Sequence, residues 1–292
     1  MLCALCVAVF IGLTVRGDGQ SWDRLGAWGY APAERVWDGA YWTLVSSAFV
    51  HLAVWHLAFN VYWLWVLGGP VERVLGPARY LGVVLGAAAV SSSVQLAASG
   101  STGHGASGIV YALFGLMWTS RKTVPAFTDG PATKNAPLFW IWLVGCIVAT
   151  QAGVADIGNG AHVGGLVFGL LSAHWLAVKG PHRKMALGAT GLFLVLSLVP
   201  LFWCPWSSAW VGYKAYEAHA RGDYDTAIAG YRRAIALGGQ RLWALQNLAL
   251  VYGAMGATNE YETTLAELRS VDAGAAAEVE TQVSQSKADR EK

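Results

Sequence analysis

Charged residues are scarce in this chain. Asp, Glu, Lys and Arg make up 13% of its 292 residues, whereas hydrophobic residues make up 55% and the mean hydropathy is +0.41. A soluble domain carries about twice that share of charge, so the composition indicates a membrane protein. The formal net charge of +2 is too small to indicate a nucleic-acid-binding protein.

Cysteine is also rare, and the four cysteines show no metal-ligating spacing. Cys3 and Cys6 have a Cys-x-x-Cys spacing, but they lie in an apolar segment, where we expect them to line a helix rather than to form a redox pair. The His-Glu-x-x-His pattern of zinc proteases does not occur. We therefore expect neither a metal nor another cofactor.

Long apolar runs dominate the first two thirds of the sequence and predict an all-α, polytopic membrane helix bundle. A membrane-spanning helix needs about 20 apolar residues, so the first and fourth runs are short. The first run lacks the basic start and the cleavage site of a signal peptide, and we expect it to remain as a helix. The seven runs cover residues 2–15, 49–67, 80–98, 107–118, 137–153, 161–178 and 185–203.

Basic residues orient the predicted bundle. They follow the second, fourth and sixth runs, whereas the connection after the third run has no charge and that after the fifth has only Asp156. Because cytoplasmic loops are enriched in Lys and Arg, the basic connections are expected inside and the long loop 16–42 outside. The basic residues are Arg73, Arg79, Arg121, Lys122, Lys134, Lys179, Arg183 and Lys184.

Polar residues interrupt three of these runs. Ser107 follows a glycine-rich turn, His162 lies in another run, and His56 and Asn60 share a face of a third because they are four residues apart. Polar groups at membrane depth are costly and indicate a functional site. A serine, a histidine and two further hydrogen-bond donors are the components of a serine hydrolase. The orientation places the starts of the Ser107 and His162 helices at the same outer face.

Each of these residues also has a structural interpretation. A lone serine in a membrane helix commonly bonds the carbonyl four residues before it. His51 lies about 140° from His56 around a helix, so we expect a structural hydrogen bond for it. His104 is a second candidate base, but a position so close to Ser107 in the chain is geometrically poor.

Three motifs in this order resemble the rhomboid family of intramembrane serine proteases over residues 1–180. They are His51-x4-His56-x3-Asn60, Gly105-x-Ser107-Gly108 and Ala161-His162-x2-Gly165-x3-Gly169. The resemblance implies a six-helix core with Ser107 as nucleophile and His162 as general base and acid. It also implies that His56 and Asn60 hold the oxyanion, that Gly105 supports the loop and that Tyr111 packs against the histidine. One departure is Thr43, where many members have arginine in a Trp-Arg pair.

The implied function is cleavage of a peptide bond in or beside a transmembrane segment of another protein. Partners would be transmembrane substrates and the lipid bilayer, with no nucleic acid. Two alternatives stay open: a catalytically silent rhomboid-like protein that binds membrane clients, and a transporter. The transporter is disfavoured because the apolar runs contain no carboxylate for a coupling ion.

After the core, residues 181–206 predict a seventh membrane helix. Residues 207–277 resemble tetratricopeptide repeats, because Gly222 and Gly256 are 34 residues apart, as are Ala215 and Ala249. Residues 278–292 are polar, and we expect a frayed tail. An odd number of crossings places the repeats outside a bacterial cell membrane, where they could bind a protein partner.

Overall fold

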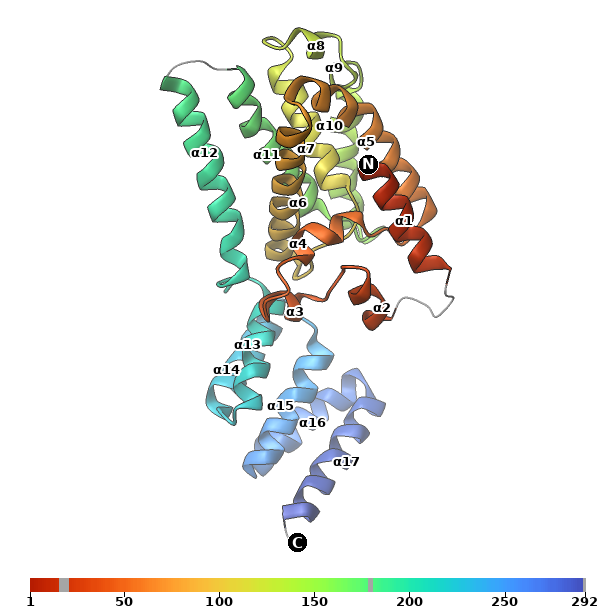
Figure 1. Ribbon diagram of the computed structural model, residues 1–292. Helices are drawn as coiled ribbons and strands as arrows, with labels where there is room; N and C mark the ends of the chain where they lie inside the picture. The colour runs from red at the N-terminus through yellow and green to blue at the C-terminus, as the bar shows by residue number, and fades with distance from the viewer. Residues whose placement is uncertain (16–20, 178–180, 291–292) are drawn as a thin grey trace. The chain divides into compact units, whose positions relative to one another are not determined.

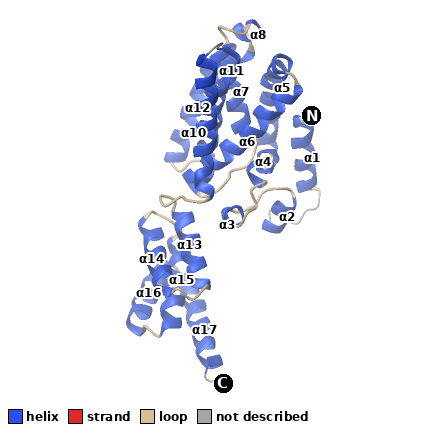
Figure 2. Cartoon of the chain, turned by 60° about the vertical axis from the view of Figure 1, so that its left-hand side comes forward, coloured by secondary structure: helices blue, strands red, loops and turns tan. Residues whose placement is uncertain are grey.

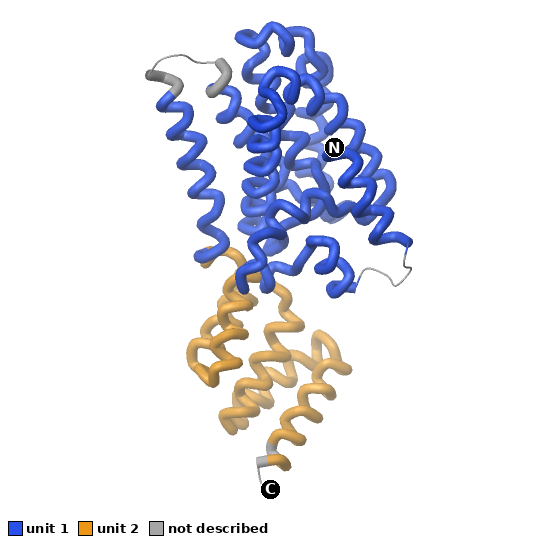
Figure 3. Tube along the Cα trace, in the orientation of Figure 1, with its two compact units in different colours: residues 1–203 blue, residues 204–292 orange. Residues whose placement is uncertain are grey.

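The computed structural model describes residues 1–15, 21–177 and 181–290, and within these ranges it contains helices and no strands (Figures 1 and 2). The all-α prediction is therefore confirmed. The chain divides into two compact units, residues 1–203 and 204–292 (Figure 3). This division lies three residues before the boundary expected at 206.

Unit 1 holds an apolar helix of 13 to 23 residues at each of the seven apolar runs. Two of them, α6 and residues Lys184–Leu201, pass a length and hydropathy test for a membrane span, or up to four if each of two bent pairs is one span. Together these helices fit a multi-pass membrane protein. They are α1 (Leu2–Thr14), α5 (Val54–Leu75), α6 (Pro77–Ser99), α7 (Ser107–Ser120), α10 (Ala136–Gln151), α11 (Asn159–Ala177) and α12 (Pro181–Leu198).

Short helices form the connections of unit 1. The long first connection contains α2 (Trp22–Ala27), α3 (Ala33–Trp37), α4 (Thr43–Ser46) and the 3-10 helix η1 (Ser47–Phe49). The connection after α7 contains α8 (Pro125–Thr128) and α9 (Pro131–Lys134), and η2 (Val199–Leu201) follows α12.

The second apolar run differs from its prediction. The helix begins at Val54 rather than near Phe49, because the backbone is extended at Val50 and Ala53, and it continues through Pro70 to Leu75. The chain bends by 102° between η1 and α5. His51 therefore lies in a turn outside the helix, and the expected angle of about 140° between it and His56 was wrong.

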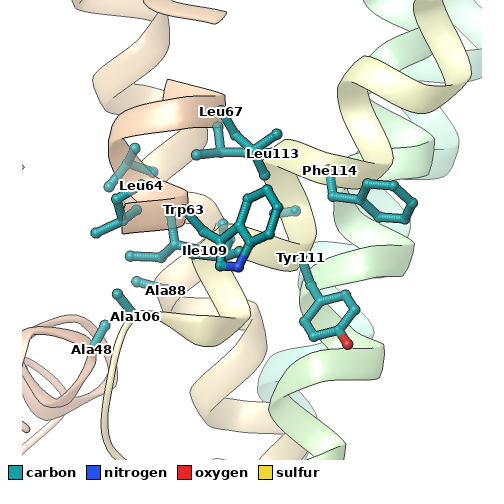
Figure 4. Packing of buried hydrophobic residues seen from close by; sticks show 14 of the residues in the cluster. Ala48, Trp63, Leu64, Leu67, Ala88, Ala106, Ile109, Tyr111, Leu113 and Phe114 are labelled. Atoms are coloured by element: carbon teal, nitrogen blue, oxygen red, sulfur yellow. The ribbon is translucent and has the colours of Figure 1, made fainter. Parts of the chain in front are cut away.

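Helix α7 is the centre of unit 1, and every residue from Gly108 to Met117 is buried. Its backbone touches that of α11: a Cβ added to Gly165 would lie 2.0 Å from the carbonyl oxygen of Gly108. On the opposite side, Trp63 of α5 packs among Ile109 and Leu113 of α7 (Figure 4). Small residues thus bring α7 and α11 into backbone contact, as in other close membrane helix pairs.

The two ends of unit 1 carry different connections. Figure 1 shows α8, α9 and the beginning of α12 at one end, and α2 and α3 at the other. The basic residues Arg121 and Lys134 belong to the first end, next to α8 and α9. Lys179 and residues 16–20 of the outer loop lie outside the described residues.

Unit 2 consists of helical hairpins joined by short turns, with glycines of positive φ at Gly222 (77°) and Gly256 (72°). The identification as tetratricopeptide repeats stays a prediction. The frayed tail expected from residue 278 is not observed, because the last helix continues to Arg290 and buries Val279 and Val283. The helices are α13 (Ser208–Ala220), α14 (Tyr224–Ala236), α15 (Arg241–Met255), α16 (Thr258–Val271) and α17 (Ala273–Arg290).

Candidate active site

The structure brings Ser107 and His162 together. Ser107 is the first residue of α7 and His162 lies in the first turn of α11, and 2.9 Å separates Ser107 Oγ from His162 Nε2. His162 is 5% exposed. With Nε2 unprotonated, the serine hydroxyl donates this hydrogen bond, which is the geometry for general-base activation of the serine.

Side chains from two neighbouring helices hold the beginning of α11 in place. Gln95 Oε1 of α6 accepts a hydrogen bond from the Ala161 amide at 3.1 Å, and Gln95 Nε2 donates to Ser99 Oγ at 2.8 Å. Asn159 Nδ2 donates to Thr150 Oγ1 of α10 at 2.8 Å. These bonds fix the helix turn that carries His162.

Tyr111 lies one turn after Ser107 on α7 and packs against the histidine. Its ring centroid is 4.8 Å from that of His162, at an interplanar angle of 34°. The Tyr111 hydroxyl donates to the Phe139 carbonyl at 3.2 Å. His162 Nδ1 has no hydrogen-bond partner among the described residues. Ring packing, rather than a carboxylate, therefore orients the imidazole.

The loop before Ser107 requires glycine at position 105. Gly105 has a φ of +93°, and a Cβ there would lie 2.5 Å from His56 Cε1. Its amide donates to the Ser47 carbonyl at 3.1 Å. A side chain would both strain the backbone and collide with His56.

His51 fixes the same loop from the other side. Its Nε2 accepts a hydrogen bond from the Ala106 amide at 3.4 Å, so Nδ1 carries the proton and donates to the Phe49 carbonyl at 3.2 Å. The structural hydrogen bond expected for His51 is thus present, although the residue lies outside the helix. Its position was missed because hydropathy does not reveal the turn at residues 50–53.

His56 and Asn60 of α5 converge on this loop. A Cβ at Gly105 would lie 2.8 Å from His56 Nε2 and 3.4 Å from Asn60 Nδ2. Asn60 is 1% exposed, yet its amide nitrogen and oxygen have no hydrogen-bond partner in the described ranges. A buried, unpaired amide is unusual and calls for a ligand or water. No side chain caps the start of α7, so its amides are also available for an anion.

One cavity of about 370 Å³ is lined by His56, Asn60, Ser107, Tyr111 and His162. Polar residues of α6, Ser91, Ser92 and Gln95, form part of its wall, and a stacked pair, Phe59 of α5 and Trp142 of α10, lies on another side with ring centroids 5.2 Å apart. The cavity thus has a polar side at α6 and an aromatic side at α5 and α10. These polar α6 residues stand out within the apolar run 80–98, but no motif marks them as part of a site.

His104 also lines the cavity but makes no described hydrogen bond to Ser107. Its ring packs against Tyr30 at 5.7 Å and against His56 at 5.6 Å. Of the two histidines, His162 is therefore the one within hydrogen-bond distance of Ser107. Within the described residues, no group of three His, Cys, Asp or Glu side chains is arranged to hold a metal ion.

The departure at Thr43 has a local explanation. The Thr43 hydroxyl is buried and donates to the Ala40 carbonyl at 2.7 Å, and Ser46 Oγ donates to the Gly29 carbonyl at 2.6 Å. Trp37 Nε1 donates to the Pro200 carbonyl at 3.2 Å. Several short contacts thus anchor the first connection without an arginine.

Comparison with known proteins finds a family and relatives that are similar to this chain. Residues 38–180 match the family described as the Rhomboid domain. The chain is 34% identical over 176 residues to Rhomboid protease GlpG of Yersinia pseudotuberculosis serotype I (strain IP32953), covering 59% of each chain. It is 36% identical over 188 residues to Rhomboid protease GlpG of Serratia proteamaculans (strain 568), covering 62% of this chain and 63% of the relative. The chain thus matches about three fifths of the length of these relatives, and these similarities support the rhomboid family for its membrane-spanning unit.

Proposed function

We propose that this protein is an intramembrane serine endopeptidase that cleaves a peptide bond in or beside the transmembrane segment of other membrane proteins. The observation that carries the proposal is the 2.9 Å contact of Ser107 Oγ with His162 Nε2, at a cavity inside a membrane-spanning helical unit. The similarity to rhomboid proteases supports the same reaction class.

In the proposed reaction, Ser107 Oγ attacks the scissile carbonyl carbon while its proton passes to His162 Nε2. The tetrahedral intermediate collapses when His162 returns that proton to the leaving amine, which leaves an acyl ester on Ser107. A water then donates a proton to His162 and attacks the ester, and the proton returns to Ser107. No carboxylate or cofactor takes part in these steps.

We expect the unpaired donors to bind the oxyanion of the tetrahedral intermediate. His56 and Asn60 lie against the Gly105 loop, and the amide of Ser107 lies at the uncapped start of α7. Donors placed where negative charge develops stabilise the transition state more than the substrate.

The substrate is a transmembrane segment that can expose its backbone. A formed helix hides its amides and carbonyls in intrahelical bonds, so small residues or Pro near the cut would favour cleavage. The repeat-like unit 2 is proposed to bind the exposed parts of such substrates by contacts along its helical hairpins.

We also propose that unit 2 is extracytoplasmic in a bacterial cell membrane. The chain leaves α12 through η2, whose Pro200 carbonyl bonds Trp37 of the first connection, and the Phe202 ring lies 5.9 Å from that of Tyr41. The exit therefore belongs to the end of unit 1 that carries the predicted outer loop.

The direct test is cleavage of a transmembrane substrate by purified protein in liposomes. Ser107→Ala and His162→Ala are expected to abolish cleavage while leaving the helix content unchanged. Ser120→Ala is the matched control, because Ser120 lies at the other end of α7 and bonds the Leu116 carbonyl like an ordinary membrane serine. Cleavage by Ser107→Ala at the wild-type rate would contradict the role of Ser107, and no cleavage by the wild type would instead indicate a client-binding protein.

A further inference from the structure

The charge of the cavity lining is a feature that the proposed chemistry does not use. Of the described residues that line the cavity, Asp156 is the sole carboxylate, and no Lys or Arg is among them. Asp156 is exposed and lies in the connection between α10 and α11, six residues before His162 in the chain. The cavity thus carries one formal negative charge, close in sequence to the catalytic helix turn.

His104, in the loop before Ser107, is the ionisable residue whose pKa responds to the charge of Asp156. Burial lowers the pKa of His104, and the charge of Asp156 opposes that shift with a smaller effect. His104 is therefore neutral at pH 7 and leaves the charge of Asp156 uncompensated.

Apolar surroundings strengthen the effect of such a charge. The rings of Tyr30 and Trp55 line the same cavity, and walls of low dielectric constant focus an electric field on what enters between them. A charged side chain of a bound substrate would interact with Asp156 over a few ångströms with incomplete screening by salt.

We propose that Asp156 selects substrates by charge, so that membrane proteins with Lys or Arg close to the scissile bond are cleaved in preference to those with Asp or Glu there. This inference rests on the proposed protease function. It assigns a specificity-determining role to a residue that takes no part in the bond-making steps.

The test uses one cleavable transmembrane substrate in liposomes, with Lys, Gln or Glu placed in turn at each of the positions flanking the cut. Wild-type protein is expected to show, at one or more of these positions, a kcat/KM ratio of Lys to Glu on the order of ten. Asp156→Asn is expected to bring that ratio close to one, and Asp156→Lys to invert it. The ratio does not depend on the fraction of active protein, so partial misfolding cannot mimic the result.

Asp129→Asn is the matched control, because Asp129 is an exposed carboxylate between α8 and α9 that does not line the cavity. This variant should keep the wild-type ratio, and high salt should lower that ratio. Equal cleavage of all substrates by the wild type, or a preference that persists in Asp156→Asn, overturns the inference while the protease function stands. Failure of the protease function itself would appear separately, as no cleavage of any of these substrates by the wild type, and failure of the Ser107 assignment as undiminished cleavage by Ser107→Ala.

Discussion

His162 differs from the histidine of a soluble serine protease at its second ring nitrogen. In the Ser-His-Asp arrangement a buried carboxylate binds Nδ1 and holds the tautomer. Here Nδ1 has no hydrogen-bond partner in the described ranges, and the Tyr111 ring supplies orientation by packing. A carboxylate in a membrane core is costly to bury, so ring packing is the less expensive way to fix the imidazole.

The proposed oxyanion donors, His56 and Asn60, should affect turnover more than substrate binding. His56→Ala and Asn60→Ala are each expected to lower kcat by about 100- to 1000-fold with little change in KM, because the lost bond forms chiefly in the transition state. Steady-state kinetics with a transmembrane substrate measures both parameters. If KM rises and kcat is unchanged, these residues serve substrate binding alone.

His51 provides the contrasting variant. It bonds the Ala106 amide rather than facing the reacting groups, so His51→Ala should lower thermal stability together with activity. The donor variants should unfold near the wild-type temperature, since Asn60 makes no bond that its removal would break within the described structure.

At the scale of helices, the catalytic distance depends on contact between two backbones. Gly165→Ala would place a methyl group 2.0 Å from the Gly108 carbonyl oxygen, with backbone rather than a flexible side chain in the way. The two helices must then separate, so we expect a loss of activity and a destabilisation of about 1–3 kcal/mol. Thermal unfolding and cleavage assays measure the two effects.

Gly188→Ala in α12 is the matched control, because a Cβ there meets nothing within 4 Å. This variant should be neutral or slightly stabilising, since alanine favours a helix. Unchanged activity in Gly165→Ala would show that the α7–α11 spacing is not what positions Ser107 against His162.

Much of this architecture could be predicted from hydropathy. The runs that gave α6, α7, α10 and α11 lie within a few residues of the helices, because a membrane helix must be apolar along its whole length. Hydropathy did not predict the turn at residues 50–53, because the chain turns there without becoming polar. His51 was therefore expected in the helix, although it lies before it. Fraying from residue 278 was expected for the opposite reason, because a polar sequence does not reveal the few buried residues, such as Val279, that hold the last helix in place.

The site was predictable to a different degree. The motifs named the residues that the structure brings together at 2.9 Å, Ser107 and His162. The lining residues Gln95 and Asp156 come from segments whose approach to Ser107 depends on packing that no local pattern encodes. Sequence patterns therefore identified the two residues that are in contact, whereas the groups that surround them could be found only from the fold.

At the scale of the whole molecule, the side of the membrane that holds unit 2 is open to test. A cysteine at the exposed position Gln240 is expected to react with a membrane-impermeant maleimide in intact cells. The four native cysteines should first be replaced, because Cys3 is partly accessible. Labelling that appears only after lysis would place unit 2 in the cytoplasm and contradict a role in recruiting substrates from outside.

Covalent labelling measures whether His162 activates Ser107 as a nucleophile. Purified protein treated with a fluorophosphonate should carry the adduct on Ser107 Oγ, as located by mass spectrometry of the digested chain. Ser107→Ala should carry none, and His162→Ala should react on the order of 1000-fold more slowly, because the serine then lacks its base. An adduct on another residue, or equal labelling of wild type and His162→Ala, would contradict the account.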